Sequence, residues 1–202
     1  MRKALALAVA RVKPDLIKAP LLQALQGQAP TVKIAAMAGL AVLQDPTAAD
    51  AILPLCDDPD LQVRAAAVVA LGKIRAPQAA PKLIELAESK QASLRAEAVI
   101  ALNHIKPPEA FDAFLKRLND PDSKTRKAAA LALGNTRRDD AVEHILPLLA
   151  DHSPDVRIAA CQSLVTLKAA AQARHVAELL LDEHEPTRDA AAVCYQKMIS
   201  LE

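Results

Sequence analysis

Histidine and cysteine are the residues with the widest chemical range in this 202-residue chain, and they number five and three. His144 and His175 stand 31 residues apart, with Glu143 and Glu178 nearby, so a shared metal site can be imagined. Protein zinc sites normally space their ligands as in HExxH or paired CxxC, and neither spacing occurs here. We therefore expect surface histidines and no metal site.

Covalent catalysis would need a nucleophile beside a base. Cys56, Cys161 and Cys194 lie within apolar helical runs, where small core positions favour buried free thiols. No Ser/His/Asp or Cys/His arrangement emerges, so the sequence predicts no catalytic residue, no cofactor and no enzyme activity. Free thiols indicate a reducing, cytoplasmic location, and no apolar stretch approaches the ~20 residues of a membrane-spanning helix.

A basic stretch between residues 116 and 138 is the main candidate for binding nucleic acid. Its members are Lys116, Arg117, Lys124, Arg126, Lys127, Arg137 and Arg138. They spread over two expected helices and two links, aspartates interleave with them, and no aromatic side chain stands beside them to stack on bases. The formal net charge of +1 adds no global attraction. We therefore interpret the stretch as a solvated surface.

A basic residue recurs every 31 residues along the whole chain. The series is Arg2, Lys33, Arg64, Arg95, Arg126, Arg157 and Arg188. Seven positions after each base stands Val9, Leu40, Leu71, Leu102, Leu133, Leu164 or Tyr195. A repeat of this length is typical of helical hairpins that stack into a solenoid, because one hairpin cannot bury both of its faces alone.

Apolar periodicity and the Pro- and Asp-containing links predict thirteen helices. An unpaired helix covers about 2–12, and six pairs begin near residues 15, 47, 78, 108, 139 and 170. We name the helix ahead of each link A and the helix that carries the repeated base B. Only three residues are aromatic, and a core of Ala, Leu, Val and Ile suits thin layers of closely packed helices.

The pattern DPDxxVRxAAxxALGxI, followed by a short AVxxLLPLL helix, resembles HEAT repeats. It is most similar to the compact 31-residue type of phycobilisome-lyase-like proteins (PBS lyase HEAT-like repeats), over essentially the whole chain. The resemblance implies an all-α fold, a right-handed α-α superhelix or HEAT-like solenoid. It would hold about six helical-hairpin repeats plus one unpaired N-terminal helix. We expect residues 1–202 to form one such solenoid without an internal boundary.

The resemblance also implies roles for particular positions. B helices line the concave face in this family, and repeated Asp and Arg residues join neighbouring repeats through the links. That structural role falls to Arg64, Arg95, Arg126, Arg157 and Arg188, whereas Lys33 departs from the pattern and cannot make a bidentate contact. The family's glycine is present as Gly72 and Gly134. Ala41, Asn103 and Val165 replace it elsewhere, so we expect those helices to end less sharply.

The face of the B helices that the core does not need is the better candidate for a binding surface. Counted from the repeated base it comprises positions +1, +5 and +9, and position +5 is aliphatic in all but one repeat. The candidate partner-binding residues are Leu7, Ala38, Val69, Lys73, Ile100, His104, Lys127, Leu131, Asn135 and Val193. Exposed apolar strips usually mark a partner surface. Half-burial between adjacent B helices would explain the same pattern without a ligand.

These observations favour an interaction scaffold or adaptor that binds a helix or peptide of a protein partner. Two alternatives stay open: an enzyme subunit of the bilin-lyase type acting on a chromophore protein and, less strongly, a HEAT-like nucleic-acid-binding protein. Neither end shows a polar cap. Either the chain is a segment of a longer array, or its ends make end-to-end or homo-oligomeric contacts.

Overall fold

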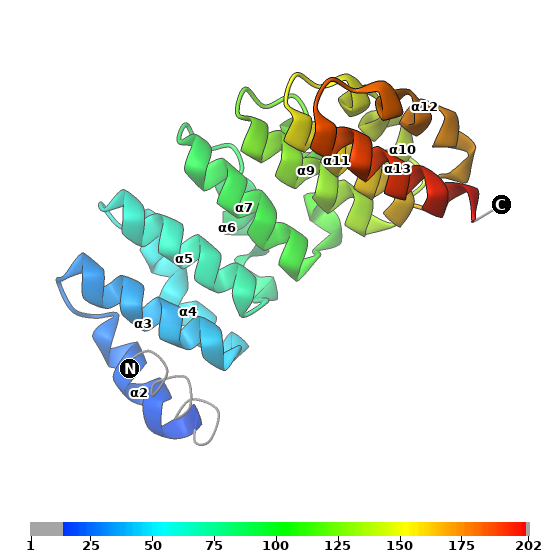
Figure 1. The fold of residues 1–202 in the computed structure, drawn as a ribbon. Coiled ribbons are helices and arrows are strands. Elements are labelled where there is room, and N and C mark those ends of the chain that lie inside the picture. Colours follow the sequence, from blue (N-terminus) through cyan, green and yellow to red (C-terminus); the bar gives the residue numbers. More distant parts are fainter. Residues whose placement is uncertain (1–13, 201–202) are drawn as a thin grey trace. The chain divides into compact units, whose positions relative to one another are not determined.

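The computed structural model describes residues 14–200, which hold twelve α-helices, seven short 3₁₀ helices and no β-strand (Figure 1). The all-α prediction is therefore confirmed for this part of the chain. The first expected helix, at about 2–12, lies outside the described residues. Contacts group the described residues into two compact units, one ending at Pro107 and one beginning at Pro108. That one continuous solenoid runs through both units stays a prediction.

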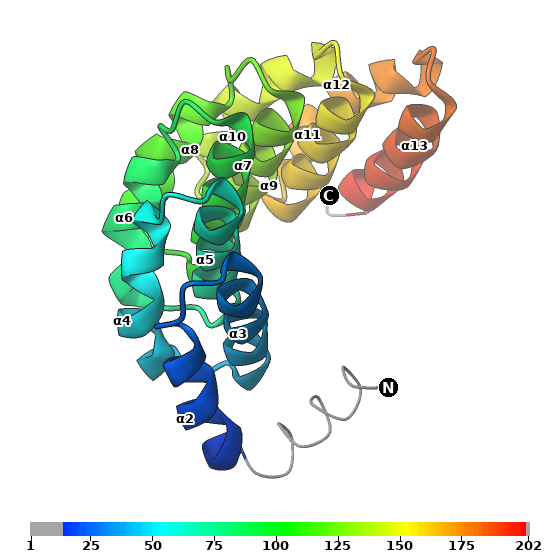
Figure 2. The same ribbon diagram turned by 90° about the vertical axis from the view of Figure 1, so that its left-hand side faces the viewer.

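The first unit alternates long B helices with shorter A segments. The B helices are α3 (Pro30–Leu43), α5 (Leu61–Lys73) and α7 (Ala92–Ile105). The A segments are α2 (Pro14–Ala24), then η1, α4 and η2 (Pro46–Ala48, Ala49–Ile52, Leu53–Asp57), then η3 and α6 (Pro77–Ala79, Ala80–Leu86). Helix α5 packs against α3 and α7, while α4 packs against α5 and α6 against α7. The B helices thus form one layer, which α4 and α6 cover on one side (Figure 2).

The second unit repeats this plan. Its B helices are α9 (Ser123–Thr136), α11 (Pro154–Thr166) and α13 (Glu185–Ile199). The A segments are η4 and α8 (Pro108–Ala110, Phe111–Arg117), α10 and η5 (Ala141–Ile145, Leu146–Ala150), and η6, α12 and η7 (Ala170–Gln172, Ala173–Glu178, Leu179–Leu181). Helix α11 packs between α9 and α13, and α8 and α12 pack against α9 and α13.

The expected alternation of A and B is confirmed, but the A segments are less regular than predicted. All five A segments after α2 combine a short α-helix with 3₁₀ turns. Pro54 and Pro147 lie inside two of these segments. Proline has no amide hydrogen for the i→i−4 bond, so an α-helix cannot run through these positions undisturbed.

The core of each unit is a row of leucines with small residues around it. The leucines seven positions after the repeated base, Leu40, Leu71, Leu102, Leu133 and Leu164, are fully buried. Tyr195 takes this position in α13 and is half-buried. Alanines such as Ala67 and Ala98 are also fully buried, which lets neighbouring B helices approach closely.

Gly72 and Gly134 provide close packing and not helix termination, which corrects the expectation from the sequence. A Cβ on Gly72 would lie 2.7 Å from the Cα of Ala101 on α7, and one on Gly134 would lie 2.7 Å from the Cβ of Ser163 on α11. Five B helices end instead at a non-glycine residue with left-handed φ: Gln44 (51°), Arg75 (52°), Lys106 (59°), Arg137 (57°) and Lys168 (56°). The helices that carry Ala41, Asn103 and Val165 therefore end as the others do, and the prediction that they end less sharply is wrong.

Candidate functional site

The repeated arginines bind the links that connect A to B. Nη1 of each donates to the carbonyl oxygen six residues earlier, at 2.7–2.9 Å. The pairs are Arg64 with Asp58, Arg95 with Ser89, Arg126 with Asp120, Arg157 with Asp151, and Arg188 with Asp182. These carbonyls end the A segments, where backbone acceptors lack helical partners. The 31-residue arginine period is thus also a period of link contacts.

In the second unit, two of these arginines also bind the aspartate 25 residues later. Arg126 donates from Nε and Nη2 to the two carboxylate oxygens of Asp151, both at 2.7 Å. Nη2 of Arg157 donates to Oδ1 of Asp182 at 2.7 Å, and its Nε lies 2.7 Å from Oδ2. The hydrogen bond from Arg157 holds the pKa of Asp182 below its ordinary value. Burial raises the pKa of Asp151, but hydrogen bonds from Arg126 and the Ser153 amide outweigh it, so this pKa is also lowered.

The same position is weaker in the first unit. Lys33 donates one hydrogen bond to Asp58, from Nζ to Oδ2 at 2.7 Å, and not the two that an arginine can make. The residue 25 positions after Arg64 is Ser89, which has no carboxylate. Its hydroxyl instead donates to Oε1 of Gln91 at 2.8 Å. The sequence shows which residue stands 25 positions after each repeated base, but only the structure shows that this residue binds the base.

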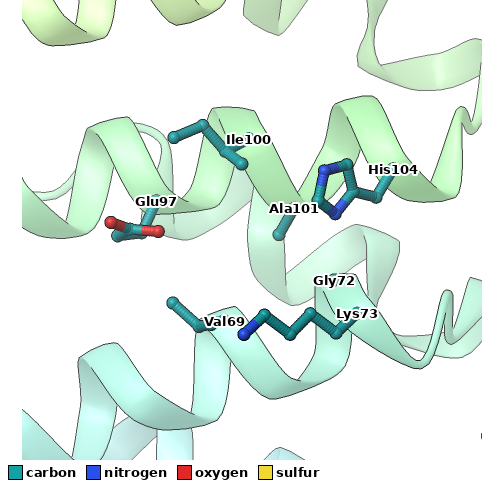
Figure 3. Close-up of a pocket in the computed structure, with 7 residues that line it drawn as sticks. All are labelled: Val69, Gly72, Lys73, Glu97, Ile100, Ala101 and His104. Carbon is teal, nitrogen blue, oxygen red and sulfur yellow. The ribbon is translucent and has the colours of Figure 1, made fainter. Parts of the chain in front are cut away.

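Five candidate partner-binding residues lie in the described part of the first unit, and four of them meet in one hollow. Val69 and Lys73 on α5 and Ile100 and His104 on α7 line a hollow of about 120 Å³, with Gly72 and Ala101 between the helices and Glu97 at one end (Figure 3). Val69 is half-buried, and Ile100 is 39 % exposed. Ala38 is exposed on α3 outside this hollow, and Leu7 lies outside the described residues.

The remaining candidates belong to the second unit and form a more polar strip. Nζ of Lys127 lies 3.3 Å from a carboxylate oxygen of Asp155, Leu131 is half-buried and Asn135 is exposed. Val193 is 51 % exposed on α13. Between them, position +5 of α11 is the exposed Gln162. The apolar strip predicted from the repeats is therefore interrupted in this unit.

Val42 is an exposed apolar residue on the same face that the list of candidates missed. It occupies position +9 on α3, where the other B helices carry polar residues, and it is 45 % exposed. The sequence already indicated this residue, because Val42 is aliphatic at a repeat position that is otherwise polar.

The basic stretch 116–138 is largely neutralised by its own unit. Arg117 lies 3.3 Å from Asp120, Arg126 binds Asp151 and Lys127 pairs with Asp155. Arg138 binds Asp140 and lies over the ring of Phe111, 3.7 Å from its centroid. A surface whose charges are paired in this way offers few free cations to a phosphate backbone.

The cysteines and histidines show no arrangement for chemistry within residues 14–200. All three thiols are buried and free, and burial raises the pKa of Cys56 and Cys161 to about 12, so neither forms the reactive thiolate. No group of three or more His, Cys, Asp or Glu side chains is placed to hold a metal in this part of the chain. Nor is any of its helices long and apolar enough to span a bilayer.

The model of the HEAT repeat family matches residues 18–103, 84–152 and 111–195. The chain therefore belongs to the HEAT repeat family. No curated protein sequence matches it significantly.

Solved structures with low sequence identity share the fold. The complex of CpcE and CpcF of phycocyanin lyase from Nostoc sp. PCC7120 is 22 % identical, with 100 % of this chain and 89 % of that chain covered and a TM-score of 0.63. The HEAT-like repeats protein of the archaeon Thermococcus onnurineus NA1 is 17 % identical, covering 97 % and 92 %, with a TM-score of 0.67. A designed armadillo repeat protein in complex with the peptide (KR)4 is 16 % identical, covering 89 % and 98 %, with a TM-score of 0.62.

Proposed function

We propose that this HEAT repeat protein is a non-catalytic scaffold that binds a helix or extended peptide of another protein on its B-helix face. The hollow between α5 and α7 carries the proposal. Its walls include Val69 and Ile100, and Ile100 remains 39 % exposed although it sits among buried helix positions. Covering such apolar surface with a partner removes it from water, at about 25 cal/mol for each Å².

Two of the similar structures support a binding role. The armadillo repeat protein holds a peptide, and CpcE and CpcF form a complex with each other. A solenoid places equivalent helix faces side by side, which creates an extended surface for one chain segment. The buried, unreactive thiols fit a protein that works without a nucleophile, and we extend the proposal to the reducing environment of the cytoplasm.

The proposal is tested by capture of partners from a lysate of the source organism. We expect Val69→Asp with Ile100→Asp to lose the partners that the unaltered chain captures, because two carboxylates would be desolvated in the hollow. Leu181→Asp is the matched control, since Leu181 is 90 % exposed and lies on η7, an A segment of the second unit. Circular dichroism must show that all variants are folded.

Unchanged capture by the folded double variant would contradict the proposed surface. The same preparation tests the non-catalytic part of the proposal. A visible absorption band from a bound tetrapyrrole, or transfer of one to a second protein, would favour the enzyme-subunit alternative.

A further inference from the structure

Four basic side chains gather where α5 and α7 end. Lys73 and Arg75 stand two positions apart at the end of α5, and His104 and Lys106 do so at the end of α7. All four residues are exposed. Within residues 14–200, none of these side chains makes a hydrogen bond or an ion pair. A molecule from outside can therefore reach the charges of Lys73, Arg75 and Lys106 and the imidazole of His104.

The acidic residues at the links of the same unit are already engaged. Asp45 binds Lys18, Asp57 lies 2.8 Å from Lys82, and Asp58 binds Lys33. Asp60 caps α5 by accepting from the amides of Gln62 and Val63. A charge paired at close range contributes little to the field at a distance. These acids therefore do not neutralise the bases at the ends of α5 and α7.

These bases adjoin the apolar hollow. Lys73 and His104 line it, and Figure 3 shows the Lys73 side chain running toward Val69 along the space between the two helices. Lys73 also lines a second hollow of about 380 Å³ with Gln44, Pro46 and Arg75. Glu97 stands at the amino-terminal end of the first hollow (Figure 3). One apolar space is therefore flanked by an acid at one end and by several bases at the other.

We propose that the occupant of this surface is an acidic segment of a protein, in which apolar side chains are followed by aspartate or glutamate. This inference rests on the proposed function and names the chemistry of the partner. An apolar side chain fills the hollow between Val69 and Ile100. The carboxylates that follow it reach Lys73 and His104 first, and then Arg75 and Lys106.

The apolar walls decide against nucleic acid as the occupant. A phosphate backbone would leave Val69 and Ile100 uncovered, and the lining of the hollow contains no Phe, Tyr or Trp ring on which a base could stack. Bases at helix ends also interact with the helix dipole, so charge alone does not identify a binding site. The binding site is indicated by the presence of unpaired bases beside an apolar hollow.

The experiment pans a random peptide library against the intact chain and measures a labelled synthetic copy of the most enriched peptide by fluorescence anisotropy. We expect enriched peptides with an apolar cluster and net negative charge. Replacing Lys73→Gln together with Lys106→Gln should raise the Kd about tenfold, because two charge pairs are lost. It should also flatten the rise in Kd between about 50 mM and about 200 mM salt.

The second unit offers a matched control. Lys197 and Lys168 occupy the same two repeat positions, +9 and +11, on α13 and at the end of α11. Lys168→Gln together with Lys197→Gln removes the same two charges beside a different hollow, which Val165, Thr166 and Gln196 also line. The Kd of the peptide should therefore stay unchanged.

The outcomes separate this inference from the proposed function. Enriched peptides that are neutral or basic, or equal binding by the Lys73/Lys106 variant, would overturn the acidic partner while leaving peptide binding intact. Binding that survives Val69→Asp with Ile100→Asp, or no enrichment at all, would overturn both. A labelled single-stranded oligonucleotide that displaces the peptide with equal affinity would assign the bases to nucleic acid and overturn the inference.

Discussion

The two units share one repeat and differ in how they use it. In the second unit, Arg126 and Arg157 each place two guanidinium nitrogens against one carboxylate, that of Asp151 or Asp182. The exposed Gln162 interrupts the apolar strip on the B-helix face of this unit. In the first unit the corresponding bases are Lys33, which makes a single bond, and Arg64, which meets a serine position. That unit instead carries the hollow that Val69 and Ile100 line, with Lys73 and His104 beside them.

The regular and the irregular positions of the repeat therefore have separate roles. Link contacts made by the arginine series recur whatever the surface does, so they hold the layers together. The proposed binding residues stand at positions that the links do not need. Substitutions at the two kinds of position should therefore have separable effects.

The largest expected effect comes from Arg157→Ala. It removes the partner of Asp182 and the donor to the Asp151 carbonyl, while Asp182 keeps a side chain only 7 % exposed. Breaking one partner of a buried pair typically costs about 3 kcal/mol, so we expect a loss of unfolding free energy near this size in urea denaturation. Hydrogen exchange should place the loss in α11 and α13.

Arg64→Ala is the matched variant in the first unit. It loses the hydrogen bonds to the carbonyl oxygens of Asp58 and Pro59, but it leaves no carboxylate without a partner. We therefore expect the unfolding free energy to fall by about 1 kcal/mol. Equal losses for Arg64→Ala and Arg157→Ala would break the distinction between the units.

Gly72→Ala should destabilise the first unit although alanine is the better helix former. The new Cβ would meet the Cα of Ala101 at 2.7 Å, and that backbone atom cannot simply turn away. Overpacking of about 1–3 kcal/mol outweighs the helix propensity gain of about 1 kcal/mol, which leaves a net loss of about 1 kcal/mol. Urea midpoints measure this, with Gly27→Ala as control because its Cβ would meet only the Ala24 carbonyl at 3.4 Å.

Gly72→Ala should also affect peptide binding. Gly72 lines the hollow, so the shift that relieves the clash should weaken the peptide selected above. Gly134→Ala makes an equally close contact with Ser163 in the second unit and should leave the peptide Kd unchanged. A parallel loss of affinity in both variants would mean that stability, and not the hollow, controls binding.

Acid should weaken the second unit through its link carboxylates. The pKa of Asp151 and of Asp182 is lower in the folded chain than in the unfolded chain, where an aspartate titrates at about pH 4. The unfolded state therefore binds protons first, and stability present above about pH 4 is lost as the pH falls toward the folded pKa values. Thermal melting from about pH 6 to about pH 3 should show this decline.

Asp182→Asn removes one of these titrating groups, so its melting temperature should start lower at neutral pH and fall less steeply with acid. The link at Ser89 and Gln91 is held by neutral hydrogen bonds, so hydrogen exchange there should change less over the same range. An equally steep decline in Asp182→Asn would exclude the Arg157 pair as a cause.

Much of the fold could be predicted because a 31-residue period is visible in residue types. The buried leucines, the order of A and B and the starts of the pairs all follow from it. The hollow could not be predicted, since it depends on how closely α5 approaches α7 at Gly72 and Ala101. The helix ends were also hidden, because lysine and arginine at a left-handed position give no signal of the kind that glycine gives.

The smallest expected effect comes from Lys106→Gly, and it tests whether one residue has two separable roles. Lys106 has φ of 59°, a conformation that costs a non-glycine residue about 1 kcal/mol, while a cation at a helix end returns about 0.3–1 kcal/mol. Glycine should therefore raise the unfolding free energy by a few tenths of a kcal/mol. The same change should weaken binding of the acidic peptide, because one of the four free bases is lost.

Lys168→Gly, with φ of 56° at the equivalent position, should gain stability without any change in peptide binding. If peptide affinity instead rose with the unfolding free energy in both variants, the bases at the helix ends would affect only helix stability and would not bind the peptide.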